Sequence, residues 1–270
     1  MLINKHFITT DIKGQTKVKR IITLTTDFGI NDHYVGSMKG VILDINSEAV
    51  ITDITHELPK YDIFKAAYTL GSFYKYFPKE TIHIVVVDPG VGSARKPIVI
   101  KSEHGTFIGP DNGVFSFVLE NSKNIDVYEI TNTDYMLSNV SSTFHGRDIF
   151  APAAAHISLG IDISQMGENV NSPVFLDINK PIINDNEIIG AVVYTDSFGN
   201  LITNIASCML KNPREICIGE FIIDTVAKSY QDVEKGKLLA IIGSLDFLEI
   251  SVNQGSAEEL IKDKRIIIRQ

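Results

Sequence analysis

The chain has 270 residues, of which 44% are hydrophobic and 21% charged, a composition typical of folded globular proteins rather than disordered ones. Its 25 Lys and Arg against 33 Asp and Glu give a formal net charge of −8, without a basic tract. Because binding to a phosphate backbone needs clustered cations, this charge argues against a nucleic-acid-binding protein. We expect no membrane span either, since the apolar runs fall well short of the roughly 18 residues that a span requires.

The cysteines and the N-terminal segment bear on the compartment. Cys208 and Cys217 lie near each other without the spacing of a zinc site, and we interpret both as free thiols of a cytoplasmic protein. Residues 1–19 carry positive charge but lack the apolar stretch of a secretory signal. They are predicted to form an extension before the first strand.

From Arg20 onward, β-branched runs alternate with stretches of helical period. Helices are predicted after Asp32, after Asp62 and from about Asp148, and strand-like runs lie within residues 21–26, 49–59, 81–87, 97–101 and 126–130. Near-continuous Ile and Val runs separated by helices are typical of a parallel sheet covered on both faces. Ligands bind such sheets beyond the carboxyl ends of the strands, where Asp27, Asp53 and Asp88 are expected.

The amino-acid composition and the hydrophobic pattern change beyond Gly160. Asn, Asp and Pro cluster over residues 162–187, and the strand-like runs that follow have few helical patterns between them. This profile predicts a smaller all-β barrel domain. We therefore expect an α/β domain with a mainly parallel sheet over residues 20–183 and a β-barrel domain over residues 184–270.

The first candidate site is the segment 25–32. An ionised Asp at a strand end offers two acceptor oxygens and can take both hydroxyls of a ribose, a role that fits Asp27. Asp32 could instead meet an ammonium group. The structural alternative is that Asp27 forms a turn and Asp32 caps a helix.

The second candidate site combines Asp88, Arg95 and His145. A Gly-containing loop could bring the Arg95 guanidinium back onto the Asp88 carboxylate, which would stay ionised and fixed in orientation. His145 precedes a glycine, titrates near neutrality and can handle a proton. Together the three could surround one water molecule; the structural alternatives are an ordinary ion pair and a histidine that caps or pairs with Asp148.

The third candidate site is the segment Asp196–Asn200 in the predicted barrel. Asn200 offers a donor and an acceptor that suit the edge of an adenine base, and Phe198 offers a face for stacking. The alternative is a β-turn with Phe198 in the core. Dinucleotide, P-loop and α/β-hydrolase chemistry is disfavoured, because their glycine and serine motifs are absent. A two-metal hydrolase remains a minor alternative, built from Asp27, Asp32, Asp53, His56, Asp88, His145 and Asp148.

Seven motifs together resemble one family. In chain order they are TLTTDFGINDHYVGSMKGVI, DITHELPKYDIFKAAYTL, VVVDPGVGSARKPI, GPDNGVFS, TFHGRDIFAPAAA, TDSFGNLITNI and FLEISVNQGSA. These are similar to the S-adenosyl-L-methionine (SAM) hydroxide adenosyltransferases, adenosine-forming SAM hydrolases related to fluorinases and chlorinases. The resemblance covers residues 20–270.

The resemblance implies an α/β domain and a small barrel, assembled as a homotrimer with each site between the large domain of one subunit and the small domain of its neighbour. It implies conversion of SAM and water to adenosine and L-methionine, with no cofactor and no metal. The resemblance implies that Asp27 binds the ribose and that Asp32, Asp196 and Ser244 bind the methionine end. Tyr61 and Phe144 are implied to form a wall of the site. The implied adenine contacts are Phe198, Tyr230, Asn200 and the backbone near Gln254.

The resemblance also implies that Asp88, Arg95 and His145 handle the attacking water. Halogenases carry a Tyr-containing motif where this chain has Asp88, and a Ser where it has Gly146. A carboxylate beside the reaction centre would repel a halide, so we expect water as the nucleophile. Leu245 stands where halogenases have an Arg at the methionine end. The main alternative is a non-catalytic adenosine- or SAM-binding protein, with a halogenase relative as a further one.

Overall fold

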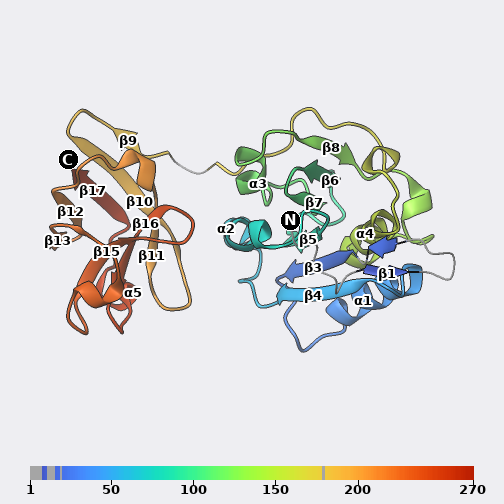
Figure 1. The fold of residues 1–270 in the computed structure, drawn as a ribbon, viewed down its shortest axis with the longest axis horizontal. Coiled ribbons are helices and arrows are strands. Elements are labelled where there is room, and N and C mark those ends of the chain that lie inside the picture. Colours follow the sequence, from blue (N-terminus) through green and yellow to red (C-terminus); the bar gives the residue numbers. More distant parts are fainter. Residues whose placement is uncertain (1–7, 11–15, 19, 178–179) are drawn as a thin grey trace. The chain divides into compact units, whose positions relative to one another are not determined.

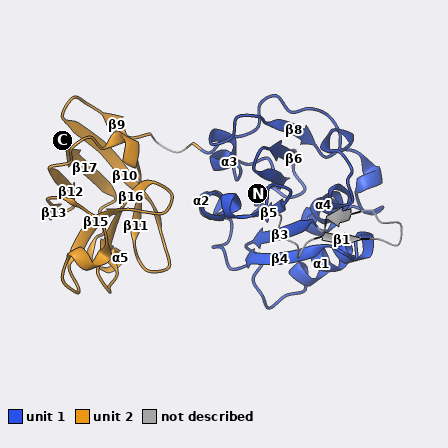
Figure 2. Cartoon of the chain, in the orientation of Figure 1, with its two compact units in different colours: residues 1–176 blue, residues 177–270 orange. Residues whose placement is uncertain are grey.

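The structure is a computed structural model that describes residues 8–10, 16–18, 20–177 and 180–270. It divides into two compact units, residues 1–176 and 177–270, each taken by itself below (Figures 1 and 2). The second unit begins a few residues before the predicted boundary and includes the short strand β9 (Ile182–Ile183), which pairs with β10 (Glu187–Thr195). Among the described residues, no helix combines the length and apolar character needed to cross a bilayer.

The predicted extension over residues 1–19 lies largely outside the described residues. Within it, β1 (Ile8–Thr10) pairs in antiparallel fashion with β2 (Thr16–Val18).

The first unit is built on a six-stranded sheet in the order β4-β3-β5-β7-β6-β8. Strands β4, β3, β5 and β7 run parallel, and β6 pairs in antiparallel fashion with β7 and β8. The mainly parallel sheet of the prediction is therefore confirmed. The strands are β3 (Ile21–Thr26), β4 (Val50–Thr55), β5 (Ile82–Val86), β6 (Pro97–Ser102), β7 (Gly105–Pro110) and β8 (Asp126–Glu129).

Helices cover both faces of this sheet. Helices α1 (Tyr34–Ile45) and α4 (Ala151–Ser158) pack in one apolar cluster with Ile84 and Val86. Helices α2 (Ile63–Phe73) and α3 (Ser116–Glu120) pack in a second cluster with Val85 and Val87. The side chains of neighbouring β5 residues thus enter opposite cores, which explains why this strand is apolar at every position except His83.

The second unit is a curved, barrel-like sheet in the order β13-β12-β17-β10-β11-β16-β15-β14, with β9 added to β10 (Figure 1). Its pairs are antiparallel except β14 with β15. Alternate residues of β16, including Leu248, Ile250 and Val252, fill its core. The other elements are β11 (Leu201–Ala206), β12 (Glu215–Ile218), β13 (Phe221–Ile223), β14 (Val226–Ala227), β15 (Leu238–Ile242), β16 (Phe247–Val252), α5 (Ala257–Leu260) and β17 (Arg265–Arg269).

Candidate active site

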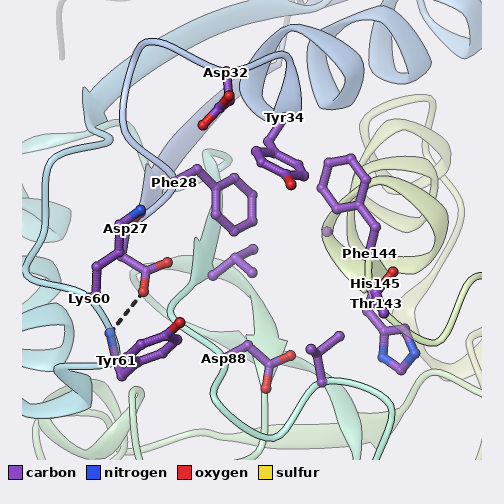
Figure 3. A pocket seen from close by; sticks show the side chains of 13 residues that line it. Asp27, Phe28, Asp32, Tyr34, Lys60, Tyr61, Asp88, Thr143, Phe144 and His145 are labelled. Carbon is purple, nitrogen blue, oxygen red and sulfur yellow. Dashed lines mark hydrogen bonds between the residues drawn. The ribbon is translucent and has the colours of Figure 1, made fainter.

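A cavity of about 220 Å³ opens where β3 and β5 end in the first unit. Six of the predicted site residues line it: Asp27, Asp32, Tyr61, Asp88, Phe144 and His145. Figure 3 shows Asp27 and Tyr61 on one side of this cavity and Phe144 and His145 on the other, with Asp88 between them. The carboxyl-end rule for parallel sheets thus located the cavity.

The Asp27 carboxylate is buried and held in place by the segment that precedes α2. The backbone N–H of Tyr61 donates to Asp27 Oδ2 at 2.9 Å, and Lys60 Nζ donates to the Asp27 carbonyl oxygen at 2.5 Å. Tyr61 adopts a φ of 65°, a left-handed conformation that is uncommon for a bulky residue. This strained turn directs its N–H toward Asp27 and leaves Asp27 Oδ1 available to a ligand.

Three aromatic rings form an apolar wall opposite Asp27. The Phe144 ring lies 5.9 Å from Phe28 and 5.1 Å from Tyr34, both close to edge-on, and Phe28 lies 5.6 Å from Tyr34. Arg147 covers the Phe144 ring at 4.9 Å and pairs with the fully buried Asp148. Arg147, rather than His145, is therefore the partner of Asp148.

The predicted cluster of Asp88, Arg95 and His145 is assembled in the structure. Arg95 Nε donates to Oδ1 and Oδ2 of Asp88 at 2.9 and 3.0 Å, and Arg95 Nη2 donates to Oδ2 as well. The same Nη2 lies 2.9 Å from Nδ1 of His145. The side chains of Asp88 and Arg95 are only 5% and 9% exposed, so their charge-assisted hydrogen bonds are shielded from solvent.

These contacts fix the proton on His145. A guanidinium can only donate, so His145 Nδ1 accepts from Arg95 and the neutral ring carries its proton on Nε2. Burial, and secondly the Arg95 charge, hold the pKa of His145 below its usual 6.5. The imidazole is therefore neutral at pH 7 and can donate a hydrogen bond from Nε2.

Gly92 allows the two loops of this cluster to meet. It has a φ of +75°, and a Cβ atom there would come within 2.2 Å of the Ser142 carbonyl oxygen. A glycine is therefore required for the loop 88–95 to lie against the loop that carries His145. The π-helical turn Gly146–Phe150, which follows His145 directly, leads from that loop into α4.

The remaining predicted site residues belong to the second unit. Asp196 Oδ1 accepts from the N–H groups of Phe198 and Asn200 at 2.8 and 2.9 Å, and Oδ2 accepts from Asn200 Nδ2 at 2.8 Å. This rigid turn leaves the Phe198 side chain 78% exposed, so the alternative that places Phe198 in the core is wrong. Tyr230, Ser244 and Gln254 are also exposed in this unit. The roles of all six residues stay predictions.

A buried carboxyl group of the second unit lies within the motif FLEISVNQGSA but was not among the predicted site residues. Glu249 is 7% exposed, and burial, with the nearby Asp196 as the next cause, raises its pKa to about 6. Burial, followed by the charge of Glu249, also raises the pKa of Tyr230. The carboxyl group of Glu249 occupies the position that a side chain on Gly243 would need.

One expectation and one structural alternative for the first unit are wrong. Asp53 was expected at the cavity but lies within β4. Its Oδ2 accepts from Lys39 Nζ at 2.6 Å. Asp32 does not cap α1: the N-cap is His33, without a side-chain cap hydrogen bond, and the Asp32 side chain lines the cavity. Within the part of the chain that the structure describes, no three His, Cys, Asp or Glu side chains converge in a way that could hold a metal ion.

Besides the apolar Val86 and Val91, four aromatic or polar side chains at the cavity were missed by sequence reasoning: Phe28, Tyr34, Lys60 and Thr143. Each of these four is within two residues of a predicted site residue along the chain. Proximity in the chain was the available signal, because none of the four carries a motif of its own.

Sequence similarity accounts for this combination of features. Residues 22–167 match the SAM hydroxide adenosyltransferase N-terminal domain, and residues 190–265 match the C-terminal domain of the same family. The chain belongs to this family. The chain is similar to an (R)-S-adenosyl-L-methionine hydrolase from Methanocaldococcus jannaschii, with 39% identity over 89% of this chain and 91% of that protein. A fluorinase from an Actinoplanes species is a more distant relative, 24% identical over 68% of this chain and 71% of its own.

Solved structures agree with the family assignment. A conserved uncharacterized protein from Thermotoga maritima is 39% identical and superposes with a TM-score of 0.83, covering 92% of this chain and all of its own. A conserved hypothetical protein from Thermus thermophilus is 30% identical, with a TM-score of 0.75, covering 93% of this chain and all of its own. The likeness to both structures extends over the α/β domain and the barrel.

Proposed function

We propose that this protein hydrolyses S-adenosyl-L-methionine to adenosine and L-methionine. The observation that carries the proposal is the joined cluster of Asp88, Arg95 and His145 at the cavity that also contains Asp27. Relatives named (R)-S-adenosyl-L-methionine hydrolase, at 32% to 39% identity, support the same substrate and the same epimer.

The proposed chemistry is a displacement at the ribose C5′ atom. The water oxygen forms a bond to C5′ while the C5′–S bond breaks. The electron pair of the C5′–S bond goes to sulfur, so the sulfonium becomes the neutral thioether of methionine. No general acid is needed, because a thioether leaves readily from a sulfonium. The protein must place the water in line with the breaking bond and receive its proton.

The hydrogen-bond pattern supports different roles for the two cavity-facing groups of the cluster. Asp88 can accept a hydrogen bond from the water, and then its proton, through Oδ1, which accepts one hydrogen bond from Arg95 and so retains a lone pair, whereas Oδ2 accepts two. His145 Nδ1 is occupied by Arg95, so the ring orients the water as a donor from Nε2. Arg95 is a positioning residue that fixes both.

The substrate would be held by the residues that the family resemblance implies. In the first unit, Asp27 would take the ribose hydroxyls, Asp32 the methionine end, and Tyr61 with Phe144 the sulfonium region. In the second unit, Asp196 and Ser244 would take the methionine end, with adenine held by Phe198, Tyr230, Asn200 and the backbone near Gln254. We propose that these two halves come from neighbouring subunits of a homotrimer in the cytoplasm; the free thiols of Cys208 and Cys217 are consistent with that compartment.

Product analysis tests the reaction. The protein is incubated with SAM in water enriched in ¹⁸O, and adenosine is separated by chromatography and analysed by mass spectrometry. We expect ¹⁸O in the 5′-hydroxyl, full activity in excess EDTA, and no halogenated nucleoside with added chloride or fluoride. Binding of SAM without adenosine above the rate of the protein-free control would instead indicate a non-catalytic binding protein.

The Asp88→Ala variant tests the cluster. Since Asp88 is proposed to act mainly in the transition state, turnover should fall by at least about a hundredfold while KM changes little. Turnover near that of the wild type would exclude the assigned role.

Mixed assemblies test the shared site. Neither Asp88→Ala nor Asn200→Ala should support turnover alone, but co-expression should restore part of it, because some sites then combine two intact halves. No recovery in mixed trimers would place both halves of the site in one subunit.

A further inference from the structure

A buried histidine of the first unit has no role in the proposed reaction. His56 follows β4, has a side chain that is only 7% exposed, and does not line the cavity. Its Nδ1 lies 2.9 Å from the Thr26 hydroxyl, and its Nε2 lies 3.1 Å from Asp53 Oδ1. These three side chains form a continuous polar chain from the partly exposed Asp53 to the last residue of β3.

The charges at the Asp53 end favour one direction for the links of this chain. The Asp53 carboxylate also accepts from Lys39 Nζ; burial raises its pKa, but Lys39 and His56 outweigh burial and leave it lowered. His56 Nε2 lies 3.1 Å from Asp53 Oδ1 without an aligned hydrogen bond, and a lone pair on Nε2 would be repelled by this carboxylate, so the His56 proton resides on Nε2 and Nδ1 accepts from the Thr26 hydroxyl. The Thr26 oxygen is then free to accept from the backbone N–H of Phe28, at 3.2 Å.

The end of the chain is the turn that presents Asp27 to the cavity. Thr26 immediately precedes Asp27, and Phe28 immediately follows it. The backbone of His56 also contacts this turn, because its carbonyl oxygen accepts a hydrogen bond from the Gly29 N–H at 2.7 Å. The flanks of Asp27 are therefore attached to one buried histidine through both its side chain and its backbone.

We propose that His56, together with Asp53 and Thr26, forms a positioning relay that sets the Asp27 carboxylate for the nucleoside ribose. This inference rests on the proposed function for the identity of the ligand. Recognition of two ribose hydroxyls needs the carboxylate within about 0.5 Å of its productive place. The relay supplies this precision through the backbone of the turn, without touching the ligand itself.

The same strand contains a matched control. Thr23 and His83 form a second buried pair, with Thr23 Oγ1 at 2.9 Å from His83 Nδ1, earlier in β3 and away from the turn at Asp27. Thr23→Val and Thr26→Val therefore remove the same type of hydrogen bond from the same strand. Only Thr26→Val interrupts the path to the turn.

The test measures adenosine and L-methionine affinity by titration calorimetry on the full-length protein, with thermal unfolding of each variant as the folding control. Thr26→Val should weaken adenosine binding at least about threefold, as expected for one hydrogen bond, and leave L-methionine binding unchanged. Thr26→Ser should restore adenosine binding because it restores the hydroxyl. Thr23→Val should lower Tm without changing either affinity.

Asp53→Ala removes the acceptor that faces His56 Nε2 and keeps the test decisive if Thr26→Val does not fold, because Asp53 lies at the partly exposed end of the relay. It should weaken adenosine binding in the same direction. Adenosine affinity equal to that of the wild type in the folded variants, or an equal loss in Thr23→Val, would overturn the relay. Wild-type protein that binds adenosine but does not hydrolyse SAM would contradict the proposed reaction and leave this test unaffected.

Discussion

The protonation state of His145 predicts how the enzyme responds to replacement of this side chain. Its Nδ1 accepts from Arg95 Nη2 at 2.9 Å, so a further proton could bind only by displacing that donor. If His145 orients water through Nε2–H, a glutamine amide can supply an equivalent donor. His145→Gln should then cost at most about tenfold in kcat/KM, the worth of one hydrogen bond.

A general-base role for His145 gives a different magnitude. Removal of a general base costs about 10²- to 10⁴-fold, and neither glutamine nor alanine can replace it. His145→Ala should therefore be clearly worse than His145→Gln only if the ring acts as a donor. Adenosine formation measured by chromatography for both variants separates the two roles.

The pH profile provides the second readout. Because the folded-state pKa of His145 is lowered, the neutral ring persists below pH 6.5, and activity that depends on it should be lost only below that value. His145→Gln should lack this acid limb. His156→Gln is the matched control, since burial also lowers the pKa of His156, on α4, but it does not line the cavity. Equal losses above a hundredfold in the Gln and Ala variants at His145 would refute the donor role.

Further expectations concern the same cluster and the second unit. Arg95→Lys should lower turnover at least about tenfold at unchanged fold by circular dichroism, because one ammonium cannot reproduce a guanidinium that spans Asp88 and His145. Gly92→Ala should lower the free energy of unfolding in urea by at least about 1 kcal/mol, since φ there is +75°. Glu249→Gln should raise the free energy of unfolding by about 2 kcal/mol at pH 8 and leave it unchanged at pH 4. The reason is that folding raises the pKa of Glu249 from its usual 4.5 to about 6, which destabilises the folded state only when the carboxyl group is ionised.

Much of the first unit follows from local sequence rules. The run 21–26 is β3 at the predicted bounds, and Asp62 caps α2 by accepting from Lys65 N at 2.8 Å. These features depend on neighbours in the chain, which the sequence displays directly. The fold class could be predicted because buried parallel strands have a composition that exposed strands lack.

The errors come from contacts between distant segments. Asp53 resembles a strand-end ligand, but Lys39, on a helix packed beside β4, neutralises it away from the cavity. Asp32 has the side chain of a good N-cap, yet in the structure it lines the cavity and α1 begins without a side-chain cap. In both cases the competing partner or position is set by tertiary packing, which no local pattern encodes.

The charges of the cavity favour water over a halide for a physical reason that the composition alone does not reveal. Asp27, Asp32 and Asp88 line it, while the cations nearby are already engaged, Lys60 by a backbone oxygen and Arg95 by Asp88. When water attacks a sulfonium, the positive charge is not lost but passes from sulfur to the departing proton. A carboxylate at residue 88 can stabilise that charge before and after the displacement, whereas it would oppose the approach of an anion. The same negative field can therefore bind the substrate and assist the proposed reaction.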